Sequence, residues 1–150
     1  MSNLLSFKSI FGWITIVENK NKILSISFGK RKNRGISNSL VKLKKILIDY
    51  FSGESKKLDF QILLNGTKLQ ISIWHELKKI PYGKTKSYGE IAKILNTSPR
   101  YVGNVCGQNK HLLIIPCHRV IRKDGDLGGF SGLGGLILKK RLLSLENNNL

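Results

Sequence analysis

The spacing of hydrophobic residues changes once along the chain, near Asn65-Gly66, and this change restricts the fold more than any other feature. Before it, residues 10–17 form an apolar, β-branched run, and residues 23–28 and 58–62 alternate apolar with polar side chains, as half-buried strands do. After it, apolar residues recur every three or four positions, which is the period of a helix that faces a core. The sequence therefore predicts an α+β fold, with a sheet in its first part and mainly helices in its second.

The first part, residues 1–64, is expected to be a small subdomain of antiparallel sheet plus one helix. The polar residues between the first two predicted strands favour a hairpin. A helix over residues 37–51, capped by Ser37 or by Ser39, is predicted from the helical spacing of its apolar residues, Leu40, Leu43, Leu47 and Tyr50.

The second part, residues 65–150, is predicted to be a mainly helical domain with three local start signals. Thr67 can cap a first helix. Ser87 and Glu90 have the spacing of a capping box, which opens a second helix. Ser98-Pro99 supplies a further N-cap with proline at the first helical position.

The last two of these helices are short and are joined by a polar break at Asn96-Thr97, as in a helix-turn-helix. The second begins with Arg100 at the end where recognition helices contact DNA. Any other pair of packed helices with a short loop gives the same pattern. A helix-turn-helix and a plain helical pair therefore both remain open as interpretations of the pattern alone.

The chain is strongly basic, with 26 Lys and Arg against 9 Asp and Glu and a formal net charge of +17. Such an excess favours a polyanionic partner, and nucleic acid is the first candidate. Lysines spread over every solvated face of an ordinary protein are the alternative. Residues 1–64 hold 12 basic and 4 acidic side chains and residues 65–150 hold 14 and 5, so charge does not indicate which part binds DNA.

The sequence shows neither a basic leader before an apolar run nor a stretch of about 18 apolar residues. We therefore expect a soluble, cytoplasmic protein without membrane contact. We also expect a monomer that is associated with the nucleoid, or is nuclear in a eukaryotic host. The two cysteines, Cys106 and Cys117, are too few for a disulfide framework and lack the further ligands of a zinc site. We expect no metal and no cofactor.

Residues 112–121 look like a buried apolar strand that runs into Pro116 and then into Cys117 and His118. A free thiol has a pKa of about 8.5 and needs a neighbouring base to act as a nucleophile at neutral pH. His118 is adjacent, but adjacent side chains on a strand point to opposite faces. Coupling the two residues therefore requires a sharp turn after Pro116 or a bridging water.

Each of these residues also has an ordinary structural interpretation. An isolated cysteine is usually a small buried hydrophobe, and we assign that packing role to Cys106, which has no His, Asp or Glu near it in sequence. His118 alone would be a hydrogen-bonded core residue, and Arg119 alone a surface cation. Their occurrence together after Pro116 favours a nucleophilic role for Cys117.

The motif Pro116-Cys117-His118-Arg119-Val120 resembles the active-site motif of the O6-alkylguanine-DNA alkyltransferases, also called methylated-DNA-protein-cysteine methyltransferases. The resemblance covers most of residues 67–146, whereas the N-terminal part is similar only in its outline of strands and helix. The other shared features occur in the family's order: Trp74, Pro81-Tyr82-Gly83-Lys84, Ser87-Tyr88, residues 98–103, Asn109, residues 114–121, Phe130-Ser131-Gly132 and residues 142–146.

The resemblance implies repair of DNA by direct reversal of damage. In such proteins the damaged guanine is swung out of the duplex and its O6-alkyl group moves to the cysteine as a stable thioether, so one molecule repairs one lesion. It implies that Cys117 is the nucleophile, that His118 is the base acting through a water, and that Glu146 orients the imidazole. Tyr88 is the residue implied to donate a proton to the guanine ring.

The resemblance also implies which residues hold the DNA and the everted base. Arg100 is the finger that fills the gap left in the duplex. A helix-turn-helix that approaches the minor groove contacts DNA through Pro99, Arg100, Tyr101, Gly103 and Arg119. The base is held by Asn109, Val120 and a closing loop, Phe130-Ser131-Gly132; Asn109 in addition ties the helix-turn-helix to the reactive turn.

Two features depart from the family pattern. Tyr101 occupies a position of the recognition helix that is often small, and a bulky side chain there changes the fit to the groove. The segment Leu133-Gly134-Gly135 makes the connection to the last helix longer than is usual, which bears on where Glu146 lies.

Three other classes of protein were weighed against this interpretation. A non-catalytic lesion-binding relative keeps the DNA-binding frame but replaces the cysteine, and Cys117 argues against it. An ordinary helix-turn-helix regulator does not need the motif that begins at Pro116. A cysteine hydrolase generally takes its histidine from a distant part of the chain and turns over, unlike a single-use acceptor.

Overall fold

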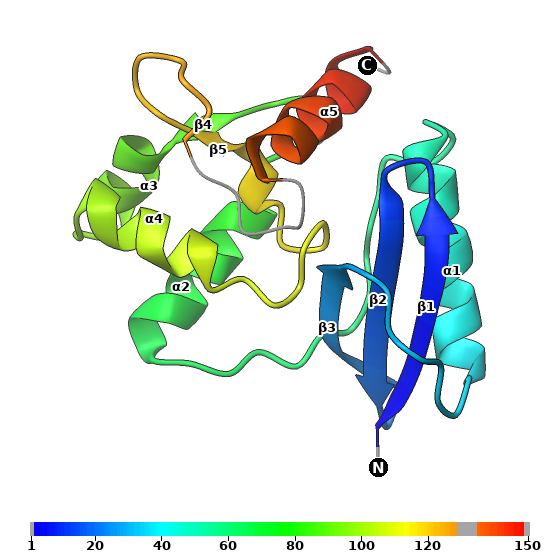
Figure 1. Ribbon diagram of the computed structural model, residues 1–150. Coiled ribbons are helices and arrows are strands. Elements are labelled where there is room, and N and C mark those ends of the chain that lie inside the picture. The colour runs from blue at the N-terminus through cyan, green and yellow to red at the C-terminus, as the bar shows by residue number, and fades with distance from the viewer. Residues whose placement is uncertain (1, 129–134, 149–150) are drawn as a thin grey trace. The chain divides into compact units, whose positions relative to one another are not determined.

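The computed structural model describes residues 2–128 and 135–148 (Figure 1). The chain forms two compact units, one of residues 1–64 with 110–114 and the other of residues 65–109 with 115–150. In the described part of the chain, no helix combines the length and the apolar character that a membrane span requires.

The first unit is built on an antiparallel sheet of three consecutive strands, β1 (Asn3–Ser9), β2 (Gly12–Asn19) and β3 (Lys22–Phe28), in that order. The link between β2 and β3 is Lys20-Asn21, and both residues have positive φ, 51° and 64°. A two-residue turn of this kind follows the right-handed twist of the strands that it joins. The predicted hairpin is therefore present.

The strand β1 was not predicted, and the run at residues 10–17 is split between a turn at Ile10-Phe11 and β2. Four successive residues of β1, Leu4 to Phe7, are buried. A strand that is covered on both faces shows no alternation of apolar and polar residues, so the pattern that would have indicated it is missing.

The helix α1 (Asn38–Phe51) packs against β1 and β2 (Figure 1). Ser37 is its N-cap, since its hydroxyl accepts a hydrogen bond from the backbone of Leu40 at 3.3 Å. Ser39, the alternative cap, donates to Asn21 instead. The predicted core positions on this helix are all buried, namely Leu40, Leu43, Leu47 and Tyr50.

Two predicted strands are wrong, at residues 58–62 and at residues 112–115. Each segment pairs with one residue of β3: Ile23 bonds to the backbone of Gln61 and Leu63, and Ile26 bonds to the backbone of Lys110 and Leu112. The chain then turns at Leu113, whose φ is +78°. The edge of β3 is thus shared by two short segments, neither of which continues as a strand.

The second unit contains four helices and a two-stranded parallel pair within the described residues. The helices are α2 (Lys68–Lys78), α3 (Tyr88–Ile94), α4 (Pro99–Gly107) and α5 (Gly135–Asn148), and the strands are β4 (Lys86–Ser87) and β5 (Val120–Ile121). The predicted capping box at Ser87 is complete, and the predicted cap at Thr67 is also part of a complete box, with Gln70. Ser98 caps α4 with Pro99 in the first turn.

The helices α3 and α4 pack against each other across a tight turn. Asn96 has a positive φ of 55°, and the backbone N–H of Thr97 donates to the carbonyl of Ala92 at 2.9 Å. Asparagine tolerates this left-handed conformation, which ends a helix while satisfying its last carbonyls. The predicted break at Asn96-Thr97 is therefore present.

Thr67→Ala is expected to lower the free energy of unfolding by about 1 kcal/mol, because the Thr67 hydroxyl and the Gln70 side chain satisfy each other's backbone N–H groups at the start of α2. Urea denaturation followed by circular dichroism measures the effect. Thr67→Ser, which keeps the hydroxyl, is the matched control and should unfold as the wild type does. An alanine variant as stable as the serine variant would contradict the assignment.

Candidate active site

Cys117 is the first residue of a sharp turn that follows Pro116. Residues Cys117–Arg119 form one turn of 3₁₀ helix, closed by a hydrogen bond from the backbone of Arg119 to the carbonyl of Pro116 at 2.9 Å. The strand β5 begins at the next residue. The turn that the sequence requires in order to couple Cys117 with His118 is therefore present.

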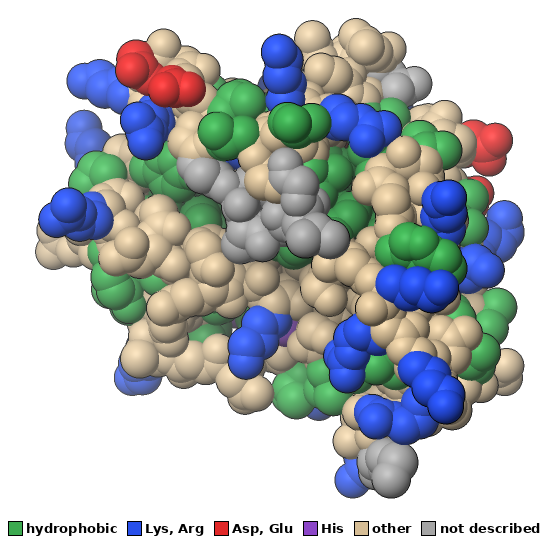
Figure 2. All heavy atoms as spheres, in the orientation of Figure 1, with side chains coloured by type: hydrophobic (Ala, Val, Ile, Leu, Met, Phe, Trp, Pro, Cys, Tyr) green, Lys and Arg blue, Asp and Glu red, His purple; other side chains and the backbone are tan. Residues whose placement is uncertain are grey.

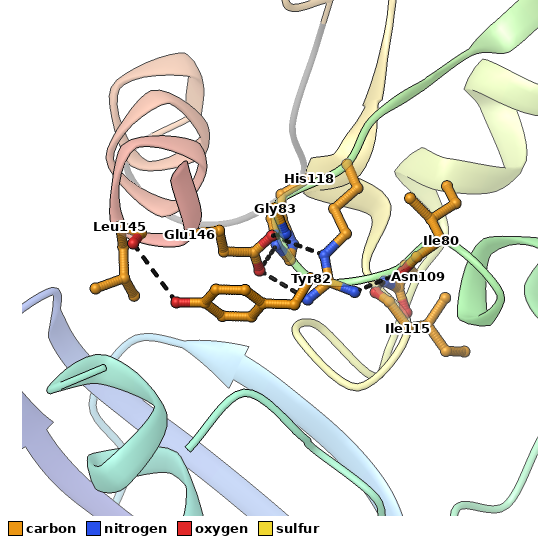
Figure 3. Close-up of polar contacts among 9 residues, drawn as sticks. Ile80, Tyr82, Gly83, Asn109, Ile115, His118, Leu145 and Glu146 are labelled. Carbon is orange, nitrogen blue, oxygen red and sulfur yellow. Dashed lines mark hydrogen bonds and ion pairs between the residues drawn. The ribbon is translucent and has the colours of Figure 1, made fainter. Parts of the chain in front are cut away.

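Asn109 fixes this turn to the end of α4. Its side-chain amide donates to the carbonyl of Ile115 at 2.8 Å (Figure 3). The same amide donates to Sγ of Cys117 at 3.3 Å. Burial raises the pKa of Cys117 to about 11, although the Asn109 hydrogen bond and the positive charge of Lys139 act in the opposite direction. Cys117 is therefore a protonated thiol at neutral pH until a base takes its proton.

Glu146, on α5, lies at the centre of a buried charged cluster (Figure 3). Its carboxylate accepts from Nε2 of His118 at 2.7 Å, from Nε and Nη2 of Arg119 at 2.8 Å each, and from the backbone of Gly83 at 3.2 Å. Burial alone would raise the pKa of Glu146, but the hydrogen bonds from His118 and Arg119 outweigh it and hold the pKa well below its usual range. Glu146 is therefore ionised.

The ionised carboxylate decides which nitrogen of His118 carries hydrogen. A carboxylate only accepts hydrogen bonds, so Nε2 must be the protonated nitrogen of the ring. Burial lowers the pKa of His118, which keeps the imidazole neutral and Nδ1 free of hydrogen. Nδ1 is buried and has no hydrogen-bond partner in the described part of the chain. His118 thus presents an unoccupied basic nitrogen.

A second polar group on α5 lies beside Tyr88. Lys139 is fully buried, and its ammonium donates to the carbonyl of Val120 at 2.6 Å, to Oη of Tyr88 at 3.3 Å and to the carbonyl of Leu127. Burial raises the pKa of Tyr88 to about 12 and lowers that of Lys139. Lys139 is not among the residues predicted from the sequence, although it lies seven residues before Glu146 and hence on the same face of one helix.

The ring of Tyr88 is confined by two glycines. A Cβ on Gly128, whose φ is +69°, would lie 2.9 Å from Cε2 and Oη of Tyr88. A Cβ on Gly103 would lie 3.9 Å from the other edge of the ring. The absence of a side chain at Gly128 is therefore what leaves room for the hydroxyl of Tyr88.

An open cavity of about 620 Å³ lies beside these groups within the second unit. Its wall includes both thiols, the Tyr88 ring and three cationic side chains, with the lining residues Cys106, Cys117, Tyr88, Arg100, Arg122 and Lys123 among them. Cavities of this size hold small organic ligands. Cys117 therefore combines burial among protein atoms with access to a ligand-sized space.

The structure brings some of the predicted residues to the cavity and leaves others away from it. Pro99, Arg100 and Gly103 line it, whereas Tyr101 is half-buried on the same helix. Val120 is fully buried, and its carbonyl is bound by Lys139. The predicted loop Phe130-Ser131-Gly132 lies outside the described residues.

The structure adds to what the sequence indicates about Cys106 and Arg119. Cys106 is buried as expected. It also lines the cavity that Cys117 lines, so it borders this space as well as packed side chains. Arg119 was predicted to contact DNA, yet it is only 8% exposed and its nitrogens are bound by Glu146 and by the carbonyl of Ile80. Three of its five N–H donors are thus already engaged, and the DNA contact stays a prediction.

Residues 2–128 and 135–148 contain no group of three or more His, Cys, Asp or Glu side chains that could hold a metal ion.

Residues 68–148 match the family model described as "6-O-methylguanine DNA methyltransferase, DNA binding domain", which is more than half of the chain. The chain belongs to this methyltransferase family. A methylated-DNA–protein-cysteine methyltransferase of Metallosphaera sedula is 39% identical over 148 residues, which is 95% of this chain and 92% of that protein. The family resemblance seen in the sequence is thus confirmed.

Solved structures of the methyltransferase family have the same fold as this chain. The O6-methylguanine methyltransferase of Mycobacterium tuberculosis aligns with a TM-score of 0.88 at 31% identity, covering 100% of this chain and 95% of that one. The M. tuberculosis OGT in complex with DNA aligns with a TM-score of 0.88 at 33% identity, covering 97% and 93%. The predicted α+β architecture is therefore confirmed.

Glu146→Gln is expected to lower the free energy of unfolding at pH 7 by about 3 to 5 kcal/mol, because it leaves the buried Arg119 guanidinium without a counter-charge. Because Glu146 has a lower pKa in the folded protein, its stabilisation is complete above the pKa of an unfolded glutamate, about 4.3, and declines as pH falls below it. The gap between variant and wild type should therefore narrow in acid. Denaturant titrations at several pH values measure it.

Glu54→Gln, at an exposed glutamate of the first unit, is the matched control and should change stability little at any pH. A gap for Glu146→Gln that stays constant down to pH 3 would contradict the assigned pKa direction.

Proposed function

We propose that this protein repairs DNA by transferring an alkyl group, methyl in the simplest case, from O6 of guanine to Sγ of Cys117. The observation that carries this proposal is the position of Cys117, which borders an open cavity. Cys117 lies in the same turn as His118, and His118 is hydrogen-bonded to the buried Glu146 of α5. The family match and the names of the relatives support the same reaction.

The base in this reaction is Nδ1 of His118. The tautomer fixed by Glu146 leaves a lone pair on Nδ1, and that nitrogen has no partner among the described residues. Because buried polar atoms are normally hydrogen-bonded, a water is the natural partner for Nδ1. Such a water carries the Cys117 proton to His118, and Glu146 stabilises the imidazolium that results.

The transfer itself is a direct displacement at the alkyl carbon. Sγ of Cys117 forms a bond to that carbon while the bond from carbon to O6 breaks, and its electron pair passes into the guanine ring. The Oη of Tyr88 accepts a hydrogen bond from Lys139, so its own hydrogen is available to the ring as negative charge develops there. The Tyr88 proton neutralises the guanine, which stays attached to its deoxyribose in the DNA. Tyr88 then regains a proton from solvent, and the His118 imidazolium releases one.

The product limits the protein to one reaction. A thioether on Cys117 is a poor leaving group, and no residue described in the site supplies a route back to the thiol. The protein is therefore consumed stoichiometrically.

DNA enters through the helical unit. We assign α3 and α4 as a helix-turn-helix, with Pro99, Arg100, Tyr101 and Gly103 facing the minor groove and Arg100 in the gap left by the everted base. The M. tuberculosis OGT, which was solved in complex with DNA, supports DNA as the partner. Asn109 and Val120 then hold the base through the turn that they brace. The protein acts as a cytoplasmic monomer.

Incubation with duplex DNA that carries labelled O6-methylguanine is expected to transfer at most one equivalent of label per protein, all of it on the peptide that contains Cys117. Peptide mass analysis measures the stoichiometry and the site. Cys117→Ser should take up none, because serine is a far weaker nucleophile. Cys106→Ser is the matched control, and any label that it takes up must still lie on the Cys117 peptide. Label on Cys106, or more than one equivalent, would refute the proposal.

Arg100→Ala is expected to slow transfer from duplex DNA much more than transfer from the free alkylated base, because only the duplex leaves a gap for the side chain to fill. Rates with both substrates measure the difference. Lys93→Ala, which removes an exposed cation from α3, is the control for the loss of charge. Equal losses on the two substrates would rule out the finger role.

A further inference from the structure

Two cations follow the reactive turn directly and lie on a second, smaller turn. Arg122 comes after β5, and its backbone N–H donates to the carbonyl of Asp126 at 2.7 Å. The backbone N–H of Gly125, whose φ is +89°, donates to the carbonyl of Arg122 at 3.0 Å. The backbone of this turn, residues 122–126, is therefore held in place while Arg122 and Lys123 line the cavity that contains Cys117.

Neither side chain has a strong ion pair within the described residues, so both can bind an external anion. The ion pair between Arg122 and Asp126 is 3.9 Å long with both side chains about two-thirds exposed, and pairs of this kind contribute little. The carboxylate of Asp124 accepts a hydrogen bond from the backbone N–H of Asp126. The carboxylate of Asp126 accepts one from the backbone N–H of Leu127. Lys123 is exposed and has no ion pair in the part of the chain that the structure describes.

Net charge does not by itself single out this turn, because Lys and Arg are spread over the face drawn in Figure 2. Position does. The cavity is bordered by Arg100 from α4 and by Arg122 and Lys123 from the turn, so cations from two separate elements surround the space next to Cys117.

We propose that Arg122 and Lys123 bind the phosphates that flank the everted nucleotide, which positions the damaged base over Cys117. This inference rests on the proposed function. A nucleotide leaves the stack by rotating about its own backbone, so its flanking phosphates must approach the cavity together with the base. Arginine binds phosphate through paired N–H groups, and lysine adds a point charge. The two residues thus act as positioning residues, distinct from Arg100 in the gap.

The test is the double variant Arg122→Ala/Lys123→Ala. Its matched control is Lys68→Ala/Lys78→Ala, which removes two exposed charges from α2, away from the cavity. A second variant, Arg122→Lys/Lys123→Arg, keeps both charges. Transfer from lesion-containing duplex and from the free alkylated base is measured with each protein, and binding to a fluorescent lesion-containing duplex is followed by anisotropy across a range of salt concentrations.

The double alanine variant is expected to lose at least tenfold in rate on duplex DNA and much less on the free base. Each phosphate contact contributes about 0.9 to the slope of log affinity against log salt, so the slope should fall by about 2. The charge-keeping variant should restore that slope, and the control should lose less rate on duplex than the double alanine variant.

Three results would overturn the inference. One is a double alanine variant that matches the control in rate and in salt slope. Another is an equal loss on duplex and free base, which would mean that Arg122 acts on the cavity chemistry, for example through the pKa of Tyr88. The third is failure of the charge-keeping variant to restore the slope. A wild type that transfers no label while the slope still falls by about 2 would defeat the proposed function and leave the phosphate contact standing.

Discussion

The site depends on one buried carboxylate, that of Glu146. Burial of a charge is costly unless it is paired and hydrogen-bonded, and here His118, Arg119 and Gly83 supply the partners. These contacts join α5 to the reactive turn and to the turn that follows α2. They also fix the tautomer of His118. Position and reactivity are therefore set by the same interaction.

The helix α5 contributes a second buried charge on the same face. Glu146 binds the reactive turn, and Lys139 donates hydrogen bonds to the carbonyl of Val120 and to the hydroxyl of Tyr88. One helix thus supplies an anion beside the base and a cation beside the proton donor. Because burial raises the pKa of Cys117 to about 11, the resting thiol is protected from indiscriminate reaction and becomes a nucleophile only when its proton can leave.

Features set by local chemistry were predictable from the sequence. The caps at Thr67, Ser87 and Ser98 and the break at Asn96 need only a few neighbouring residues, and all are present. The reactive segment could be predicted because Pro116, Cys117 and His118 are consecutive and form a recognisable motif.

Features set by distant partners were missed or wrongly predicted. Arg119 has the composition of a surface cation, and only Glu146, 27 residues away, makes it a buried one. Lys139 has an ordinary sequence context for a solvated lysine, yet its partners belong to other segments. The segments at 58–62 and 112–115 alternate or are apolar as strands are, but each has only one residue of β3 to pair with.

The mechanism requires a neutral His118, with hydrogen on Nε2 and none on Nδ1. Nitrogen NMR of the imidazole in selectively labelled protein at pH 7 tests it most directly. We expect a protonated-type signal for Nε2 and an unprotonated-type signal for Nδ1, both unchanged as the pH is lowered to 6. A ring with hydrogen on Nδ1, or an imidazolium at pH 7, would contradict it.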